Sequence, residues 1–174
     1  MSNFPTLIPA FTAQVVIDPL NVIGPLATGP ALFQIPFKPS SGTVTSHPSY
    51  AVKLDADILH GADYIKADPA GSSSSIARLE VQSVIKDKTT GALARFNYTG
   101  FVNTAGPAGK VLRGEADAKT TPFGDAFTHV TFETSSASGE LAALSNKVFV
   151  ASGHFILEDG KPTIVEYLIS EVAK

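Results

Sequence analysis

One short run in this sequence brings together the side chains needed for acid–base chemistry, His60-Gly61-Ala62-Asp63-Tyr64. Histidine titrates near neutrality, aspartate accepts or orients a proton, and a tyrosine hydroxyl donates a hydrogen bond into an apolar pocket. We therefore interpret Asp63 as a candidate base, with His60 or Tyr64 as the acid or orienting group. The alternative is a turn in which Asp63 bonds its own backbone while Tyr64 packs into the core.

A second candidate pair is His129 and Glu133, which lie on one face of the strand expected at 126–134. Residues four apart in a strand are separated by about 13 Å, so the two side chains cannot bond each other directly. They are nevertheless able to line one cavity, with Glu133 as base and His129 as acid. The alternative is an outward, solvated face.

Two further polar residues are candidate ligand contacts. His154 stands in an otherwise apolar strand, a setting more typical of a core or interface histidine with one nitrogen bonded. Arg78 shares a face with Glu80 and Gln82, beside the strand that contains Arg95. That arrangement favours a cross-strand ion pair on an outer wall, and the alternative is a polar interior in which Arg78 binds a carboxylate.

Several kinds of site are excluded or disfavoured by what the sequence lacks. It has no cysteine, which excludes disulfides, thiolate ligands and a cysteine nucleophile. It contains no phosphate-binding loop, dinucleotide fingerprint, zinc-protease motif or nucleophile elbow. Three histidines with Glu133 have no spacing that favours a metal. We therefore expect neither a metal nor a cofactor.

The composition limits the partners. Charged residues make up only 17% of the chain, the net charge is −3, and the 13 Lys and Arg are scattered, so nucleic acid is not an expected partner. A lightly charged surface favours a homo-oligomer. The sequence begins without a signal-peptide pattern and has no run of about eighteen apolar residues, so we expect a cytoplasmic protein with no membrane partner.

The elements that must position these residues are strands. Short β-branched and aromatic runs recur along the chain, each closed by Gly, Pro, Asn or Asp, which predicts an all-β fold. We expect residues 1–174 to form a single antiparallel β-barrel, calycin/lipocalin-like or a related closed barrel, with at most short helical turns. The predicted strands are 7–18, a bent one around 31–35, 50–58, 76–86, 92–102, 126–134, 147–157 and 163–172. A break separates 50–58 from the run at His60, loops are predicted at 40–48 and 69–75, and helical turns at 115–119 and 140–146.

The order of several short motifs resembles a family of small β-barrel proteins known as domain of unknown function 3237. The motifs are Gly61-Ala62-Asp63-Tyr64, Arg78-Leu79-Glu80, Tyr98-Thr99-Gly100, Phe132-Glu133-Thr134 and Leu144-Ser145-Asn146. The family typically has tryptophan at the position of Tyr64 and Trp-Leu-Asn near Asn146. The resemblance implies an antiparallel barrel with a central cavity and no settled activity. From these motifs we add Tyr98 and Asn146 to the candidate ligand contacts.

Three functions follow as hypotheses. The first is a barrel that binds a small, largely apolar molecule and performs cofactor-free acid–base chemistry of the isomerase, cyclase or lyase type. The second is a non-catalytic binder or carrier in the same barrel. The third is a structural or interaction protein that acts as a homo-oligomer, with its barrel filled by its own side chains.

Overall fold

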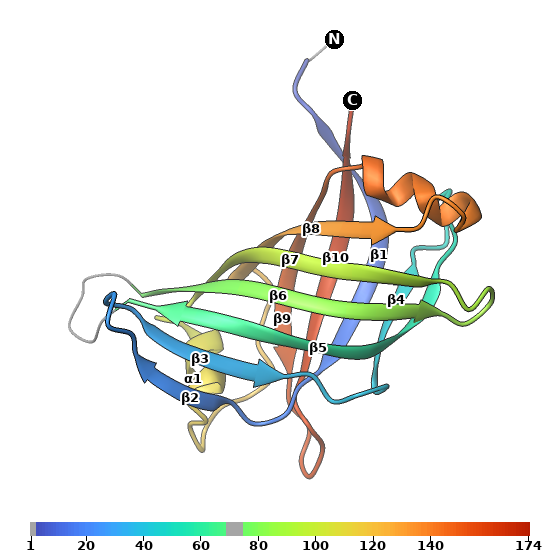
Figure 1. The fold of residues 1–174 in the computed structure, drawn as a ribbon. Coiled ribbons are helices and arrows are strands. Elements are labelled where there is room, and N and C mark those ends of the chain that lie inside the picture. The colour runs from blue at the N-terminus through green and yellow to red at the C-terminus, as the bar shows by residue number, and fades with distance from the viewer. Residues whose placement is uncertain (1–2, 69–74) are drawn as a thin grey trace.

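The strands of the described chain form one continuous antiparallel sheet (Figure 1). The computed structural model describes residues 3–68 and 75–174. The strands are β1 (Thr6–Val16), β2 (Asn21–Pro25), β3 (Ala31–Pro36), β4 (Gly42–Ser46), β5 (Asp55–Ala67), β6 (Ile76–Asp87), β7 (Leu93–Asn103), β8 (Ala126–Thr134), β9 (Phe149–Ile156) and β10 (Ile164–Ala173). The helices are α1 (Pro107–Leu112) and the 3-10 helix η1 (Gly139–Asn146).

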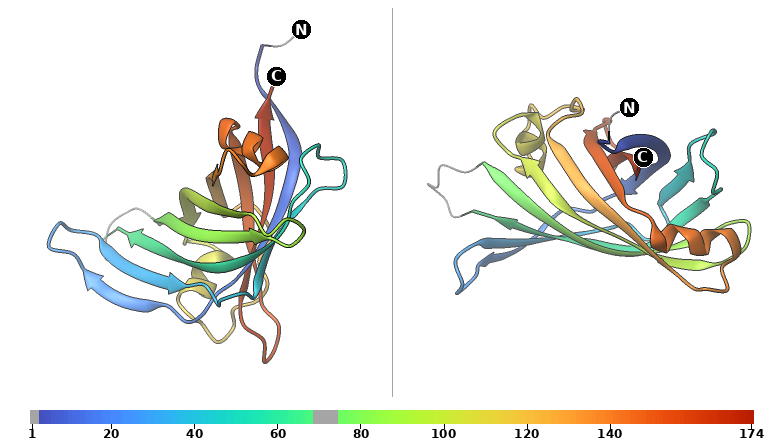
Figure 2. Two further views of the ribbon diagram at one scale, coloured as in Figure 1. Left: turned by 45° about the vertical axis from the view of Figure 1, so that its right-hand side comes forward. Right: turned by 90° about the horizontal axis from the view of Figure 1, so that it is seen from above.

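Eight of these strands close into a barrel, in the order β5-β4-β1-β10-β9-β8-β7-β6, with β6 pairing back onto β5. The predicted closed antiparallel β-barrel is therefore confirmed. The remaining pair, β2 and β3, forms a hairpin beside the barrel wall (Figure 2). It attaches because β4 covers only the first half of β5, which leaves the second half, Ala62–Ala67, to pair with β3.

Strand β5 contains an irregularity that decides which of its side chains enter the barrel. Its pairing with β6 shifts register between Ile58 and His60, as a β-bulge does. Ile58 faces inward before the bulge, and Gly61, Asp63 and Ile65 face inward after it. The predicted break at His60 is therefore wrong, because the bulge lets the strand bend and continue.

Other local predictions also need correction. The predicted loop at 40–48 contains β4, whose β-branched Thr43, Val44 and Thr45 pair with β1 and β5. The predicted strand at 50–58 begins only at Asp55; the alternation before it reflects an irregular segment that packs Val52 and Leu54 against the core.

Four further predictions concern a bent strand, two helical turns and a loop. The bent strand predicted around 31–35 is one arm of the β2–β3 hairpin. At 115–119 a single turn forms, in which the Ala118 N–H donates to the Glu115 carbonyl at 3.0 Å, but no helix. The helix forms earlier, where Pro107 begins α1 with a φ angle suited to a first turn. The turn predicted at 140–146 is confirmed as η1. Most of the loop predicted at 69–75 lies outside the described residues.

The two ends of the barrel differ. The end near η1 is filled by aromatic rings whose neighbouring centroids lie 5.0–5.7 Å apart, namely Phe11, Tyr50, Phe96, Phe132 and Phe149. The opposite end is covered by α1, which follows β7 and contacts β9 (Figure 1). At this second end the barrel interior retains space beside the buried Asp63. No helix in the described ranges is long and apolar enough to cross a membrane.

Candidate functional site

A buried carboxyl group marks the interior of the barrel toward the α1 end. The Asp63 side chain is only 8% exposed, and its Oδ1 accepts a hydrogen bond from the Glu80 backbone N–H at 3.1 Å. Burial raises the pKa of Asp63 from its ordinary 3.8 to about 7, and the nearby charge of Glu80 adds to that rise. At neutral pH the group is therefore poised between its proton-donating and proton-accepting forms, as a general acid or base requires.

Two buried tyrosines accompany this carboxyl. The rings of Tyr98 and Tyr167 lie 5.0 Å apart, and their hydroxyls are hydrogen-bond partners. Burial raises the pKa of both phenols well above the ordinary value, and the negative charge of Asp63 raises them further. Both phenols stay protonated at any physiological pH. Because one bond between two phenols uses only one of their protons, the other proton is left for a group in the cavity.

The strand register explains how residues so far apart in the sequence meet. Asp63 on β5 lies opposite Val81 on β6, and Val81 lies opposite Tyr98 on β7. Tyr167 reaches the same space from β10 across Gly153 of β9. The ring fits there because Gly153 has no side chain.

Three cavities surround this group. The innermost, about 20 Å³, is lined by Asp63, Tyr98 and Tyr167 together with apolar side chains. A space of that size holds about one water molecule. Two larger cavities, of about 590 Å³ and 390 Å³, lie at the α1 end. Ile35 and Leu112 line all three, so these two side chains separate the buried acid from the larger spaces.

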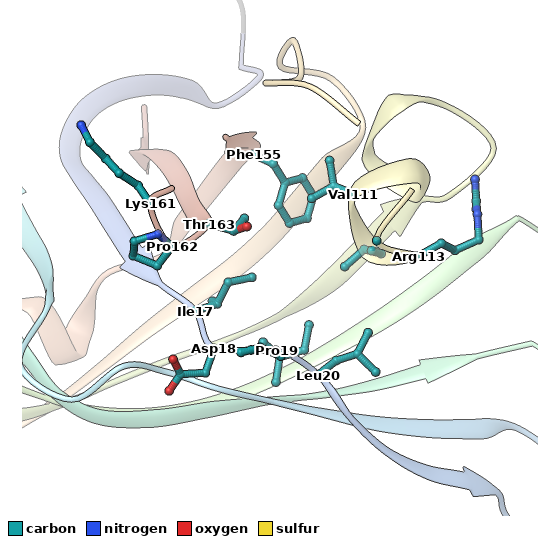
Figure 3. Close-up of a pocket in the computed structure, with 13 residues that line it drawn as sticks. Ile17, Asp18, Pro19, Leu20, Val111, Arg113, Phe155, Lys161, Pro162 and Thr163 are labelled. Carbon is teal, nitrogen blue, oxygen red and sulfur yellow. The ribbon is translucent and has the colours of Figure 1, made fainter. Parts of the chain in front are cut away.

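The largest of the three is apolar inside and charged at its margin (Figure 3). Phe155 of β9 lies beside Val111 of helix α1, and Ile17, which follows β1, lies nearby. The charged ends of Arg113 and Lys161 are directed away from these rings and methyl groups (Figure 3). The cavity therefore combines an apolar lining with a charged margin.

The structure separates Asp63 from its neighbours in the sequence. His60 and Tyr64 lie on the outer wall, where Tyr64 is 41% exposed. Adjacent residues in a strand face opposite sides, and the bulge before Gly61 sets Asp63 inward. The structure therefore places the candidate acids His60 and Tyr64 away from Asp63, on the other side of the barrel wall.

The second candidate pair also lies outside the barrel. His129 and Glu133 are exposed, and Glu133 Oε2 accepts a hydrogen bond from Arg95 Nη1 at 2.7 Å. This exposed ion pair joins β7 to β8 on the outer wall. The placement matches the solvated alternative rather than a cavity lining.

The four candidate ligand contacts occupy different places. Tyr98 lies inside, as described above. Arg78 is exposed and pairs with Asp68 at 3.1 Å, and Asn146 is exposed at the last residue of η1. His154 faces outward, with Nδ1 bonded to the Thr121 carbonyl at 2.8 Å and Nε2 to Glu166 at 3.2 Å. Both of its nitrogens thus have structural partners.

Tyr167 is the site residue that sequence analysis missed. The strand that contains it was predicted at 163–172, and alternation places Val165, Tyr167 and Ile169 on one face. To identify Tyr167 as a site residue, one must also know that this face of β10 points into the barrel. That orientation depends on the pairing of β10 with β9 and β1. Among residues 3–68 and 75–174, no three acidic or histidine side chains cluster as metal ligands would.

Comparison with known proteins agrees with this fold. The chain resembles a conserved protein of unknown function from Rhodopseudomonas palustris (TM-score 0.68, 19% identity, covering 98% of this chain and 99% of that one). It also resembles a protein with unknown function from Clostridium acetobutylicum, with a TM-score of 0.70 and 17% identity, covering 97% of this chain and 99% of that one. A third similar structure is a beta-barrel like protein from Acinetobacter baumannii, with a TM-score of 0.66 and 20% identity, covering 100% of this chain and 99% of that one. No protein with a curated description matches. Residues 5–172 match the model of the family described as Protein of unknown function (DUF3237), and the chain belongs to that family.

Proposed function

We propose that this protein binds a small, largely apolar carbonyl compound at the α1 end of the barrel and moves a proton on it. The reaction class is a cofactor-free isomerisation in which Asp63 is the base. The observation that carries the proposal is the buried Asp63 carboxyl, with its pKa raised to about 7, in one cavity with two protonated phenols.

The chemistry follows from the donors and acceptors present. The Asp63 carboxylate takes a proton from the carbon next to the substrate carbonyl, and the electron pair moves onto the carbonyl oxygen. Tyr167 donates a hydrogen bond to that oxygen, which stabilises the negative charge in a site without bulk water. In a substrate with a C=C bond one carbon further from the carbonyl, the intermediate is a dienolate, and Asp63 returns the proton to its far carbon. The C=C bond then lies next to the carbonyl, and no atom is gained or lost.

Tyr98 acts through Tyr167 in this scheme. Its hydrogen bond to the Tyr167 oxygen polarises the second phenol and makes it a better donor. Tyr98 is therefore a positioning residue, whereas Asp63 and Tyr167 are the groups expected to contact substrate.

Access to the site requires movement of side chains. The inner cavity of about 20 Å³ accepts no more than a water-sized group. Leu112, at the end of α1, lines this cavity and both larger ones. A shift of Leu112 would join the apolar space for the body of the substrate to the space beside Asp63.

The test measures hydrogen exchange, which needs no knowledge of the natural substrate. A panel of small cyclic ketones is incubated with the protein in D₂O, and loss of the α-proton signals is followed by NMR. We expect the wild type to accelerate exchange for at least one ketone and Asp63→Asn to abolish it. Asp57→Asn, on the exposed part of the same strand, is the matched control and should keep full activity.

A non-catalytic carrier is the second candidate, favoured by the two larger cavities, which need no acid to hold a ligand. Native mass spectrometry of protein purified from its own source tests it. A retained organic molecule, together with ketone exchange no faster than the background rate, would favour the carrier over the isomerase.

A further inference from the structure

We propose that the outer face of β7–β10 is the surface through which this protein binds a second copy of itself. We call this surface the outer apolar face, and it is defined by Phe101, Phe127, His129, Val150, Ser152 and Leu168. It lies on the outside of the barrel wall, whereas Asp63 faces the interior, so the proposal is independent of the proposed isomerase activity.

The strand register makes this face continuous. One row of outward side chains crosses four strands, because Phe101 pairs with Phe127, Phe127 with Ser152, and Ser152 with Leu168. The next row runs parallel to it through His129 and Val150. The apolar side chains are thus held as neighbours by the backbone ladder.

The shape of the face is self-complementary. The rings of Phe101 and Phe127 lie 6.0 Å apart and form one ridge, and Leu168 forms a second. Between the ridges stands the small Ser152, within a groove of about 630 Å³. In a two-fold contact, the Phe127 ridge of each copy meets the Ser152 hollow of the other, since both copies present the same patch.

The exposed apolar area is sufficient for a specific contact. Phe101, Phe127 and Leu168 are 41–49% exposed, and Leu7, which lines the same groove, is 60% exposed. Thr99 and His129 of the same groove are also exposed. Six such side chains of about 150–200 Å² each, about half exposed, give roughly 500 Å² per copy. A two-fold contact would then bury about 1,000 Å² in total, the lower limit for a specific interface.

The charge distribution indicates which kind of partner binds the outer apolar face. The outer apolar face has no Lys, Arg, Asp or Glu in its lining, whereas the outer wall beside it contains the pairs Arg78–Asp68 and Arg95–Glu133. An apolar centre with a polar rim is the anatomy of a protein interface. An uncharged face offers nothing to a charged partner, but it matches a second uncharged face of the same shape. The chain's low charged fraction of 17% points the same way.

The first test is the mass of the full chain in solution, by light scattering and sedimentation across about 1–200 µM, the usual range for weak to moderate self-association. We expect a particle of twice the 18.2 kDa chain mass that dissociates on dilution. Phe127→Glu and Leu168→Glu should each reduce it to the single-chain mass at all concentrations. Leu93→Glu is the control, because Leu93 is 56% exposed on β7 but lies outside the face. Circular dichroism confirms that all variants are folded.

A cross-link gives a second, independent readout. The chain contains no cysteine, so Ser152→Cys introduces a single thiol at the centre of the face. A bismaleimide cross-linker that spans the contact should join two copies of Ser152→Cys, and adding Phe127→Glu should prevent it. Three outcomes would overturn the proposal: a single-chain particle at every concentration, an oligomer that persists in both glutamate variants, or wild-type chains that remain single and bind neutral phosphatidylcholine vesicles through this face.

Discussion

Gly153 and Tyr167 lie directly opposite each other in the β9–β10 pair, and the ring of Tyr167 occupies the space above Gly153. A Cβ atom at position 153 would lie 2.5 Å from Tyr167 Cε1 and 2.7 Å from Cδ1. The ring is thereby held against the barrel wall, where it meets Tyr98. A glycine with no chemistry of its own thus sets the position of the phenol that we propose as the hydrogen-bond donor to substrate.

The first prediction concerns this contact. Gly153→Ala should destabilise the protein by about 1–3 kcal/mol, because the added methyl group forces the Tyr167 ring to move within a packed interior. Urea denaturation measures the stability, and ketone exchange should slow in the same variant. Ser152→Ala, the outward neighbour, should change stability by less than about 0.5 kcal/mol. Equal stability of the wild type and Gly153→Ala would show that the ring has room to shift.

The second prediction links Asp63 to the pH dependence of folding. The pKa of Asp63 is raised from 3.8 to about 7 in the folded protein, so between these values the folded state binds the proton and the unfolded state does not. The contribution of Asp63 to the free energy of unfolding is therefore largest below about pH 4. It decreases as the pH rises to about 7 and stays constant above that. The total fall has an upper bound of about 4 kcal/mol.

Thermal melts of the wild type and Asp63→Asn between pH 4 and 8 measure this effect. The asparagine variant should gain stability relative to the wild type as pH rises, with the difference levelling off above pH 7. Asp57→Asn, at an exposed position, should track the wild type across the range. A difference between the wild type and Asp63→Asn that does not change with pH would mean that Asp63 is ionised throughout.

The third prediction is the pH profile of ketone exchange. Because the carboxylate form of Asp63 is the base, the rate should fall about tenfold per pH unit below its pKa of about 7 and reach a plateau above it. The NMR exchange assay, repeated at constant ionic strength from pH 5 to 9, gives the profile. A rate independent of pH across 5–7 would show that the base has an ordinary carboxyl pKa, and would contradict the raised pKa of Asp63 as its cause.

The fourth prediction separates the two buried phenols. Tyr167→Phe should lower the exchange rate by about 10²–10³, the usual loss for one donor to a developing oxyanion. Tyr98→Phe should have a smaller effect, because it removes only the bond that polarises Tyr167. The exposed Tyr64→Phe is the control and should have no effect. If Tyr98→Phe proved the more damaging of the two, their roles would be exchanged.

The fifth prediction concerns access past α1. Leu112→Ala should join the cavities that Leu112 now separates and speed the binding of a neutral apolar fluorophore such as N-phenyl-1-naphthylamine, measured by stopped flow. Leu112→Phe should slow it by filling the same space. Leu93→Ala, outside these cavities, is the control. Equal association rates in both Leu112 variants would place the entry route elsewhere.

Much of the fold could be predicted because alternation is a local signal. Alternation of apolar and polar residues with a period of two, ended by turn residues, predicts the hairpin at 76–102 and the strands at 126–134, 147–157 and 163–172. The order of motifs likewise indicated the family. Asp63 is a candidate because of its residue type and its neighbours, and Tyr98 because it stands in the family motif Tyr98-Thr99-Gly100.

The sequence by itself determined the strand content, the barrel class and the identity of its polar residues, because these depend on residues near one another in the chain. Only the tertiary structure decided which faces point inward. The bulge between Ile58 and His60 reverses the alternation of β5, so that Asp63 enters the barrel while His60 remains outside. Closure of the sheet then brings Tyr167 to Asp63 from more than a hundred residues away. No local sequence pattern predicts that Asp63 and Tyr167 lie close together, because their proximity depends on the pairing of all eight barrel strands.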